Sequence, residues 1–253
     1  MIDPNNDPDV RYETVHQCLC GAETGPGPVW GWDVCPACGT WVNSNRPTAD
    51  SLPAVYGENY WTTAQEMANC PPLETRFESD MLDRIPAYLS AIVPHLGPGA
   101  RVAEVGCGNA RLLHELAKQG FRVTGTEFSP QIIARVARLT SVPILQGGVE
   151  RLEPGTFDAV LSIDVMEHAH EPAAFLSSHA RVLRAGGLLV VHTPVHEKPN
   201  DPYAYSVGMI WKLYHLYLFS RSLIERLFEN AGLEVINADV RVFGWPMFVL
   251  RKT

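Results

Sequence analysis

The strongest constraint on the fold lies near the middle of the chain. Arg101 to Val105 is apolar enough for a short buried strand, and Gly106 and Gly108 follow it. Leucines then recur at helical spacing, and a second strand over 122–126 leads to Glu127. Glycine permits a positive φ and leaves space above the backbone, so a ligand can lie against the main chain where the helix begins. A carboxylate after the second strand could hold both hydroxyls of a ribose, so this stretch predicts a nucleoside site.

The residue at position 111 argues against a dinucleotide. The dinucleotide-binding fingerprint needs a small residue there, because the helix packs closely on the strand, and this chain has Arg111. The segment from Glu104 to Gly108 instead resembles the first motif of the Rossmann-like, class I S-adenosylmethionine-dependent methyltransferases, an acid two residues before Gly-x-Gly. In that family the glycine turn lies against the methionine part of the cofactor, and the later acid binds both ribose hydroxyls. The resemblance implies that S-adenosylmethionine is bound by Glu104, Gly106, Cys107, Gly108 and Glu127.

Residues after the second and third strands extend this site. Phe128 would lie beside the nucleoside, where its ring can cover adenine. In the family the third strand, here 142–145, usually ends in Gly-Asp, and the aspartate binds the adenine amino group. This chain has Gly148 and Val149 there and no acid. We therefore expect backbone groups around these two residues to hold adenine.

The fourth strand supplies the next candidates. Its sequence, Phe157 to Asp164, resembles the fourth motif of the family, in which a strand ends beside the cofactor. Ligands of open α/β sheets bind at the carboxyl ends of the strands, so Ile163 and Asp164 are expected to face the reaction centre. Glu167 and His168 follow, either as a catalytic acid–base pair or as a structural tie between loop and sheet.

Two more candidates rest on the same resemblance. The segment from His215 to Ser220 is similar to a His-x-x-x-Phe-Ser sequence at the start of the family's last helix. His215 would lie at the pocket mouth as a general base, or would hydrogen-bond the loop instead. Tyr60 matches a tyrosine that helps to cover the cofactor in many small-molecule methyltransferases, although its surroundings also fit a linker packed on the core. The aromatic connection from Thr193 to Tyr214 has the composition of an acceptor pocket.

Four cysteines near the N-terminus predict a zinc site. Cys18 and Cys20 form one pair, and Cys35 and Cys38 form a second pair after fourteen intervening residues. Each pair is followed by glycine, and two such turns can aim four thiolates at one tetrahedral ion. The first pair has a short Cys-x-Cys spacing, so His16 is an alternative ligand. A segment this small cannot bury enough apolar surface to fold alone, so we expect a structural Zn²⁺.

The pattern predicts an α/β fold in three parts. Residues 1–46 form a zinc-ribbon-like segment, 47–98 an aromatic linker and helical cap, and 99–253 the S-adenosylmethionine-binding domain. We expect a doubly wound, mostly parallel sheet of seven strands that closes with a C-terminal antiparallel strand. Within it, a helix from Pro172 is expected to end near Arg184, before a glycine pair and the fifth strand.

Charge and hydropathy exclude several classes of partner. The 253 residues carry a formal net charge of -8 and contain no run of lysines or arginines, so a nucleic-acid partner is not expected. No apolar run approaches the ~20 residues that span a bilayer, so no membrane partner is expected either. The acidic first residues differ from a secretory signal, which favours a cytoplasmic location.

These observations favour a methyltransferase that acts on a small molecule by in-line displacement. The cysteine-rich segment ahead of such a domain is similar to that of bacterial sugar C-methyltransferases, which suggests a secondary metabolite or sugar-like acceptor. Positioning of donor and acceptor alone is worth roughly 7–11 kcal/mol, so no catalytic dyad is required. Two alternatives stay open: a protein or carrier-bound substrate docked on the zinc segment, and a non-catalytic cofactor-binding subunit. The acceptor atom and the oligomeric state stay open as well.

Overall fold

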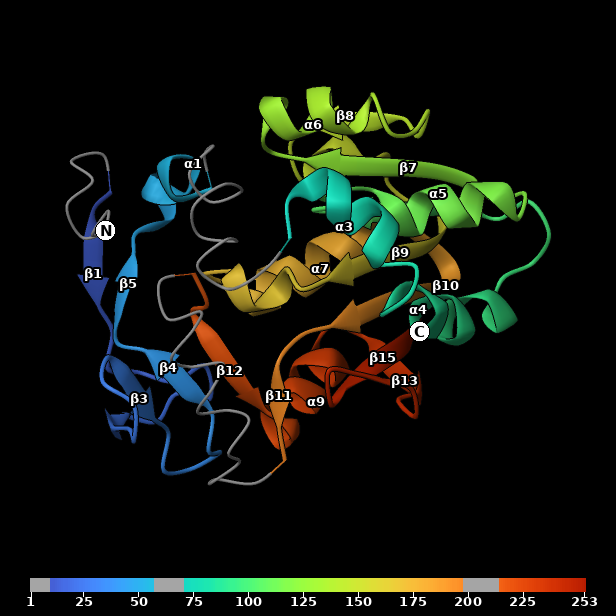
Figure 1. Ribbon diagram of the computed structural model, residues 1–253. Coiled ribbons are helices and arrows are strands. Elements are labelled where there is room, and N and C mark those ends of the chain that lie inside the picture. Colours follow the sequence, from blue (N-terminus) through green and yellow to red (C-terminus); the bar gives the residue numbers. More distant parts are fainter. Residues whose placement is uncertain (1–9, 57–70, 198–213) are drawn as a thin grey trace. The chain divides into compact units, whose positions relative to one another are not determined.

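The computed structural model describes residues 10–56, 71–197 and 214–253 (Figure 1). The chain forms two compact units, and each is built from three stretches of sequence. The first unit comprises Met1–Ala68, Glu167–His170 and Pro194–Arg226, and the second comprises Asn69–Met166, Glu171–Thr193 and Leu227–Thr253.

One mixed sheet forms the centre of the second unit. Its strands are β6 (Arg101–Val105), β7 (Arg122–Glu127), β8 (Ile144–Gln146), β9 (Phe157–Ile163), β10 (Leu183–His192), β13 (Leu233–Asn237), β14 (Arg241–Val242) and β15 (Trp245–Lys252). The main path runs β13-β15-β10-β9-β6-β7-β8, with β14 paired to β15. The five strands from β10 to β8 are parallel to one another. Strand β15 is antiparallel to both of its neighbours, β10 and β13, so β13 has the same direction as these five. The predicted seven-stranded, mostly parallel sheet with a C-terminal antiparallel strand is confirmed, and β14 adds a short eighth strand.

Helices cover the sheet of the second unit. They are α3 (Leu73–Ser79), α4 (Ile85–Ile92), η4 (Val93–His95), α5 (Arg111–Lys118), α6 (Pro130–Val136), η5 (Val149–Arg151), α7 (Pro172–Val182) and α9 (Arg221–Asn230), which begins in the first unit. Helices α5 and α6 pack on β7, and α7 packs on β9 and β10 (Figure 1). The sheet grows from β6 to β8 in one direction and from β9 to β10 in the other. Because parallel crossovers are right-handed, these two sets of helices lie on opposite faces.

Burial follows the expected patterns of these elements. Leu112, Leu113 and Leu116 of α5 are all buried, at the spacing of one helical face. Residues 159–162 of β9 and 187–192 of β10 are buried without alternation, as in strands covered on both faces. Helix α6 begins as predicted, because the Ser129 side chain accepts a hydrogen bond from the backbone N–H of Ile132. The sheet is therefore a rigid support for whatever lies at its strand ends.

Short strands form the first unit. They are β1 (Tyr12–Thr14), β2 (Gly25–Pro26), β3 (Trp32–Val34), β4 (Trp41–Asn43), β5 (Asn45–Pro47), β11 (Val195–His196) and β12 (Tyr217–Ser220), with η2 (Ala49–Ser51), α1 (Leu52–Val55) and η6 (Met166–His168), which starts at the end of the second unit. Five of these strands make a sheet in the order β11-β12-β4-β3-β2, and β1 pairs with β5. Residues distant in sequence therefore meet here, as where Leu218 of β12 pairs with Trp41 of β4.

Several predicted boundaries are wrong. The helix from Pro172 ends at Val182 rather than near Arg184, and β10 begins at once at Leu183. The glycine pair lies inside that strand, where the pairing with β9 shifts register between Leu183 and Leu188. Gly186 has φ +66°, so the glycines accommodate a bulge in a strand instead of stopping a helix. The third strand is 144–146 instead of 142–145.

None of the described helices combines the length and the apolar character that a bilayer crossing needs.

Candidate active site

Most predicted cofactor residues lie at one edge of the sheet in the second unit. The strands that carry them, β9, β6, β7 and β8, are parallel neighbours in that order, so their carboxyl ends share this edge. The residues are Glu104 in β6, Gly106 to Gly108 in the turn after it, Glu127 and Phe128 at the end of β7, Gly148 and Val149 after β8, and Ile163 and Asp164 at the end of β9.

Glu127 is joined directly to the glycine turn. Its Oε2 accepts a hydrogen bond from the backbone N–H of Gly108 at 3.2 Å, and its Oε1 accepts one from Ser129 at 3.0 Å. Burial raises the pKa of this carboxyl, although these backbone donors act in the opposite direction. The side chain is therefore fixed beside the turn, with acceptor capacity left for a pair of hydroxyls.

The turn itself presents backbone rather than side chains. Gly106 has φ +70°, and a Cβ there would lie 2.9 Å from Val165 Cγ2. Cys107 points toward the sheet, since a Cβ on Gly125 of β7 would lie 2.6 Å from its Sγ. The Cys107 side chain is buried. Any contact of Cys107 with a ligand above the turn would accordingly use its main chain.

Glu104 is the second carboxyl beside the turn. It is 6% exposed, and its Oε2 has no hydrogen-bond partner among the described residues. Burial raises the pKa of Glu104 to about 8, Arg84 lowers it, and Asp164 raises it. A buried acceptor without a partner fits a ligand that brings a donor, and the ammonium group of an amino acid is such a donor.

A buried arginine, absent from the predicted site, lies in this network. Arg84 Nη1 donates to Asp164 Oδ2 at 3.3 Å, and its Nη2 donates to Asp80 Oδ2 at 3.2 Å. Burial lowers the pKa of Arg84, but Tyr88, Asp164 and Asp80 raise it by more. The net shift is upward, so the guanidinium stays charged. The sequence signal for this pair was the spacing of four residues between Asp80 and Arg84, which suits an ion pair.

Asp164 connects the end of β9 to the end of β10. Its Oδ1 lies 2.7 Å from His192 Nδ1, and its backbone N–H donates to the His192 carbonyl at 2.9 Å. Asp164 has φ +55°, which is uncommon for a residue other than glycine. Such conformations are often retained at functional sites. Ile163, just before it, is half-buried.

An acid that the sequence pattern had not indicated lies near the residues expected to hold adenine. Phe128 is 65% exposed, as expected for a ring that covers a ligand. A Cβ on Gly148 would lie 3.1 Å from Phe128 Cζ, so the two residues are neighbours. The Gly148 backbone N–H donates to Glu150 Oε1 at 2.8 Å. The carboxylate of Glu150 thus engages the amide that was expected to hold adenine, while Val149 is half-buried beside it.

The two predicted catalytic histidines lie together in the first unit. The rings of His168 and His215 are 4.9 Å apart, and His215 Nε2 lies 3.8 Å from Glu167 Oε1. His168 Nδ1 also lies 2.8 Å from the hydroxyl of Tyr56. Tyr60, the predicted cofactor cover, is outside the described residues.

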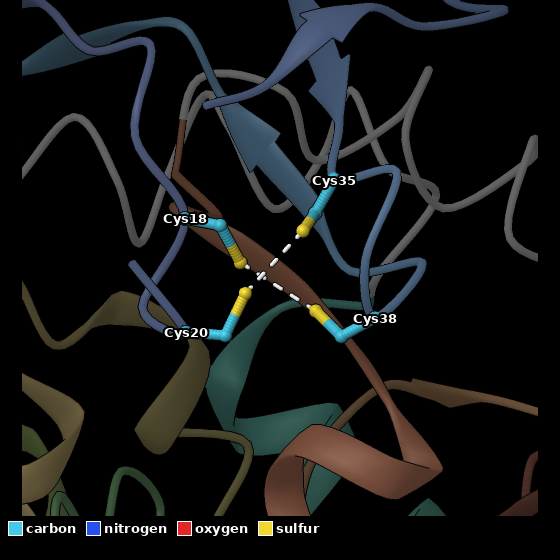
Figure 2. A group of neighbouring side chains, drawn as sticks. All are labelled: Cys18, Cys20, Cys35 and Cys38. Carbon is cyan, nitrogen blue, oxygen red and sulfur yellow. Dashed lines mark hydrogen bonds between the residues drawn. The ribbon is translucent and has the colours of Figure 1, made fainter. Parts of the chain in front are cut away.

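The four cysteines converge in the first unit (Figure 2). Cys18 Sγ lies 3.6 Å from Cys38 Sγ, and Cys20 Sγ lies 3.4 Å from Cys35 Sγ. The four sulfur atoms are all within 4.8 Å of one another, which suits one tetrahedral ion. His16 lies apart from this group, because its Nδ1 is 2.9 Å from Asp33 Oδ2. The structure therefore brings together a set of donors that could hold Zn²⁺.

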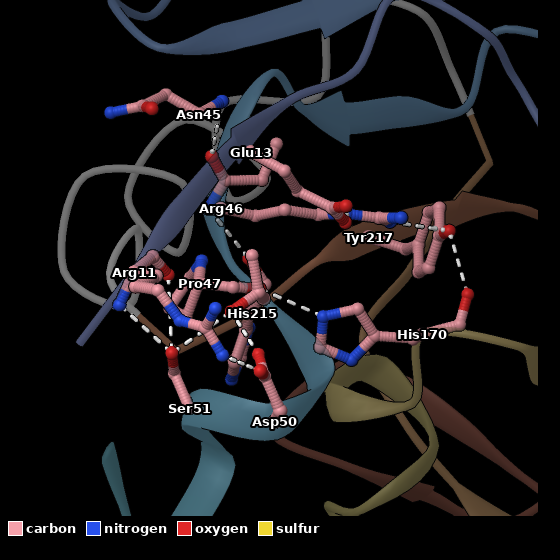
Figure 3. A network of polar contacts seen from close by, with 12 residues as sticks. Arg11, Glu13, Asn45, Arg46, Pro47, Asp50, Ser51, His170, His215 and Tyr217 are labelled. Atoms are coloured by element: carbon pink, nitrogen blue, oxygen red, sulfur yellow. Dashed lines mark hydrogen bonds and ion pairs between the residues drawn. The ribbon is translucent and has the colours of Figure 1, made fainter. Parts of the chain in front are cut away.

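A polar network around Arg46 reaches His170, two residues after His168 in the sequence (Figure 3). Arg46 Nη1 donates to the Tyr217 hydroxyl at 2.7 Å, and its Nε donates to Glu13 Oε1 at 2.7 Å. Tyr217 in turn donates to the carbonyl of His170 at 3.2 Å, and His170 Nε2 donates to the carbonyl of Pro47 at 2.8 Å. These bonds join β1, β5, β12 and residues 167–170 within the first unit.

Known proteins share this fold and part of this sequence. An O-methyltransferase of ubiquinone biosynthesis from Xylella fastidiosa is 37% identical over 118 residues, which are 42% of this chain and 46% of that protein. The chain thus matches about half the length of this curated relative. A complex of the Haloferax volcanii Trm112 methyltransferase activator and a methyltransferase has a TM-score of 0.60 at 17% identity, over 75% of this chain and 96% of that chain.

A further solved structure is magnesium protoporphyrin IX methyltransferase from Synechocystis with bound S-adenosylhomocysteine. It has a TM-score of 0.57 at 15% identity, over 78% of this chain and 97% of that chain. At such identities these likenesses show the fold alone. The family model described as a methyltransferase domain matches residues 76–238, which is more than half of the chain. The predicted family is therefore confirmed, and this chain belongs to the methyltransferase-domain family.

Proposed function

We propose that this protein transfers a methyl group from S-adenosylmethionine to a small-molecule acceptor. The observation that carries the proposal is the pair of buried carboxyls, Glu104 and Glu127, on either side of a turn that presents its main chain. Membership of the methyltransferase-domain family supports the same conclusion. The cofactor would supply a methyl group on a positively charged sulfur.

Each part of the cofactor has a matching group in the second unit. Glu127 would accept hydrogen bonds from both ribose hydroxyls, while the turn from Gly106 to Gly108 would leave room for the methionine part. The unpartnered oxygen of Glu104 would accept a hydrogen bond from the ammonium group, and the charged Arg84 nearby suits the carboxylate. Ile163 and Asp164 would lie on the reaction side, with Asp164 held by Arg84 and His192.

The adenine ring would lie against Phe128, whose face is exposed. The missing aspartate of the third strand has a substitute in Glu150, two residues after Gly148. Its carboxylate would accept a hydrogen bond from the adenine amino group, and Val149 would contact the ring edge. Tyr60 would cover the cofactor from outside.

Methyl transfer then depends mainly on alignment. Donor and acceptor held in line contribute roughly 7–11 kcal/mol without any proton transfer. A hydroxyl acceptor must also lose a proton, and a positioned base adds about 10²–10⁴-fold. His215, with Glu167 at 3.8 Å, is our first candidate for that base in the metal-free protein, and His168 is the second.

A hydroxylated small molecule is the acceptor that the relatives favour. The curated relatives are named O-methyltransferases of ubiquinone biosynthesis, and the match covers about half of their length. A secondary metabolite or sugar-like molecule with a free hydroxyl belongs to the same chemical class. The net charge of -8 favours a small-molecule acceptor over a nucleic acid, whose phosphates need a positively charged surface.

We further propose that Cys18, Cys20, Cys35 and Cys38 bind one structural Zn²⁺. Four thiolates fill a tetrahedral coordination sphere, so no position is left for a substrate. A reducing compartment such as the cytoplasm keeps these thiols free for the metal.

Calorimetry tests the proposal first. The purified protein is titrated with S-adenosylmethionine and with S-adenosylhomocysteine, and one binding site per chain is expected for each. Transfer of labelled methyl groups to a panel of phenols, sugars and other hydroxylated molecules follows. Failure to bind either cofactor form would contradict the proposal, whereas binding without transfer to any acceptor, together with an obligate partner enzyme, would favour a non-catalytic subunit.

A second candidate is a methyltransferase whose substrate is a protein or is carried by one. Trp30, in the cysteine segment, is 83% exposed, and one solved neighbour is a complex with a methyltransferase activator. Exposed apolar side chains of this size are common in interaction surfaces. A pull-down whose partner is lost with Trp30→Ala or Cys35→Ser would support this candidate.

A further inference from the structure

Three potential metal ligands meet in the first unit, away from the cysteines in sequence. Glu167 and His168 belong to η6, and His215 lies two residues before the start of β12. The backbone N–H of Leu216 donates to the carbonyl of Glu167 at 2.8 Å, which holds the two segments side by side. The Asn43 amide also donates to the carbonyl of His215 at 3.0 Å. The main chain therefore fixes the positions from which all three side chains project.

The ligand atoms are close enough to share one ion. One nitrogen from each histidine and one carboxylate oxygen lie within 4.8 Å of one another. His215 Nε2 and Glu167 Oε1 are 3.8 Å apart, and the imidazole planes are inclined at 74°. Metal–ligand bonds of about 2.0–2.2 Å place neighbouring ligand atoms roughly 3–4 Å apart, so only small side-chain movements are needed.

The protonation of His168 suits a ligand. Its Nδ1 lies 2.9 Å from the carbonyl oxygen of Tyr214. A carbonyl can only accept, so Nδ1 carries the proton and Nε2 of the neutral ring keeps its lone pair. The Tyr56 hydroxyl lies 2.8 Å from the same Nδ1 and donates to the Tyr214 carbonyl at 3.2 Å. Metal-binding histidines almost always donate their other N–H to such an acceptor, which orients the ring.

Burial gives the cluster a reason to bind a cation. The side chain of Glu167 is 1% exposed and that of His215 is 7% exposed. Removing a carboxylate from water is costly unless a positive charge compensates it. A divalent cation bound by the three side chains would supply such a charge.

We propose that Glu167, His168 and His215 form a second metal site, for a divalent first-row transition ion such as Mn²⁺, Fe²⁺, Co²⁺ or Zn²⁺. Two imidazoles and one carboxylate favour these ions over Mg²⁺ and Ca²⁺, which prefer oxygen ligands alone. The site differs from the cysteine cluster because three protein ligands leave coordination positions open. An oxygen ligand such as water or a hydroxyl would fill one of them and would lose its proton more readily there.

This site changes the role of the histidines when it is loaded. An ion would occupy His168 Nε2 and a nitrogen of His215, so the imidazoles would act as ligands and no longer as the base of the metal-free protein. Metal binding itself is independent of the proposed methyl transfer, and it is measured without any acceptor.

Cobalt titration tests the site in the intact protein with its cysteine cluster filled by zinc. We expect one Co²⁺ per chain, with the d–d absorption of nitrogen and oxygen ligands and without the intense thiolate charge-transfer bands. Glu167→Gln, His168→Gln and His215→Gln should each weaken cobalt binding by more than roughly 10–100-fold. That range is typical for loss of a residue that hydrogen-bonds a metal ligand without touching the metal. Tyr56→Phe should fall within that range. His95→Gln, an exposed histidine of η4, is the matched control and should bind as the wild type does.

Each variant is checked by circular dichroism and by its affinity for S-adenosylhomocysteine. If a variant fails to fold, the wild-type protein still decides, because bound Co²⁺ should shift imidazole N–H signals far outside the normal proton NMR range. The proposal would be overturned if Co²⁺ did not bind, or if it bound only with thiolate charge-transfer bands. Unchanged Co²⁺ affinity in all three ligand variants would also overturn it.

Discussion

The two units position their candidate sites by different means. In the second unit, the carboxyls and the glycine turn lie at the ends of parallel strands whose apolar side chains are almost wholly buried. In the first unit, the strands near the cysteines are two or three residues long, and the four cysteine sulfur atoms lie within 4.8 Å of one another. A packed sheet holds the former site through its main chain, whereas we propose that the latter depends on an ion. The two regions should therefore respond differently to the same treatments.

Removal of the metal from the cysteine cluster should have the largest effect. Structural zinc contributes an apparent ~10–16 kcal/mol to the folding of small zinc-binding segments. We expect chelation or Cys35→Ser to abolish zinc binding and make residues around β2 to β4 sensitive to protease, while cofactor binding by the second unit persists. Mass spectrometry of the proteolytic fragments and calorimetry with S-adenosylhomocysteine measure the two responses.

His16→Ala provides the control for this experiment. His16 is paired with Asp33, so this variant should keep its zinc and its protease resistance. A metal-free protein that resists protease as well as the loaded protein would remove the contrast between the two regions.

The second largest effect should be on the pH dependence of stability, and Glu104 should cause it. Its pKa is about 8 in the folded protein, above the ~4.3 of an unfolded glutamate. A raised folded pKa gives stability that is complete below the unfolded pKa and is lost as the pH rises through about 8. Glu104→Gln should not lose stability in this way. In mildly alkaline buffer its free energy of unfolding should exceed that of the wild type by up to about 5 kcal/mol.

Urea unfolding of the cofactor-free protein in acidic, neutral and alkaline buffers measures this difference. Glu153→Gln, an exposed acid in the same unit, should follow the wild type. Identical pH profiles for Glu104→Gln and the wild type would show that the carboxyl is not buried as described.

Glu127→Gln should weaken cofactor binding by roughly 10–100-fold. A hydrogen bond to a charged group contributes about 1.5–3 kcal/mol, and the amide replaces a charged acceptor by a neutral one that can accept with only one atom. Calorimetry with S-adenosylhomocysteine measures the loss, again with Glu153→Gln for comparison. An affinity equal to that of the wild type would place the ribose elsewhere.

Glu150→Gln should have the smallest effect of the series. The residue is exposed, and one hydrogen bond to adenine is worth about 0.5–1.5 kcal/mol, so an affinity loss of a few-fold is expected. The loss should disappear when the ligand carries hypoxanthine in place of adenine, because that base lacks the amino group. Equal losses for both ligands would mean that Glu150 acts only by holding the Gly148 amide.

Local patterns were sufficient to predict the centre of the fold. The turn from Gly106 to Gly108 lies between a strand and a helix that are contiguous in sequence, so spacing alone identified it. The cysteine pairs are similarly short motifs, and each sits in its own turn. Glu127 lies at the end of the next strand after this turn, and its carboxylate accepts a hydrogen bond from the Gly108 amide.

Contacts between distant segments could not be predicted in this way. Arg84 meets Asp164 across eighty residues of sequence, and only the folded sheet brings the end of β9 to the start of α4. Glu150, which we propose as the acceptor for the adenine amino group, was not predicted because the family pattern considers only the residue at the strand end. A side chain two residues later reaches the Gly148 amide. The glycine pair before the fifth strand was misread because glycine both stops helices and permits bulges, and pairing with β9 decides between the two.

A crystal structure with S-adenosylhomocysteine tests the central claim most directly. The account predicts that both ribose hydroxyls lie within hydrogen-bond distance of the Glu127 carboxylate, that the ligand ammonium lies against Glu104, and that the main chain from Gly106 to Gly108 borders the ligand. A ligand bound elsewhere, or a Glu127 side chain turned away from the ribose, would contradict it.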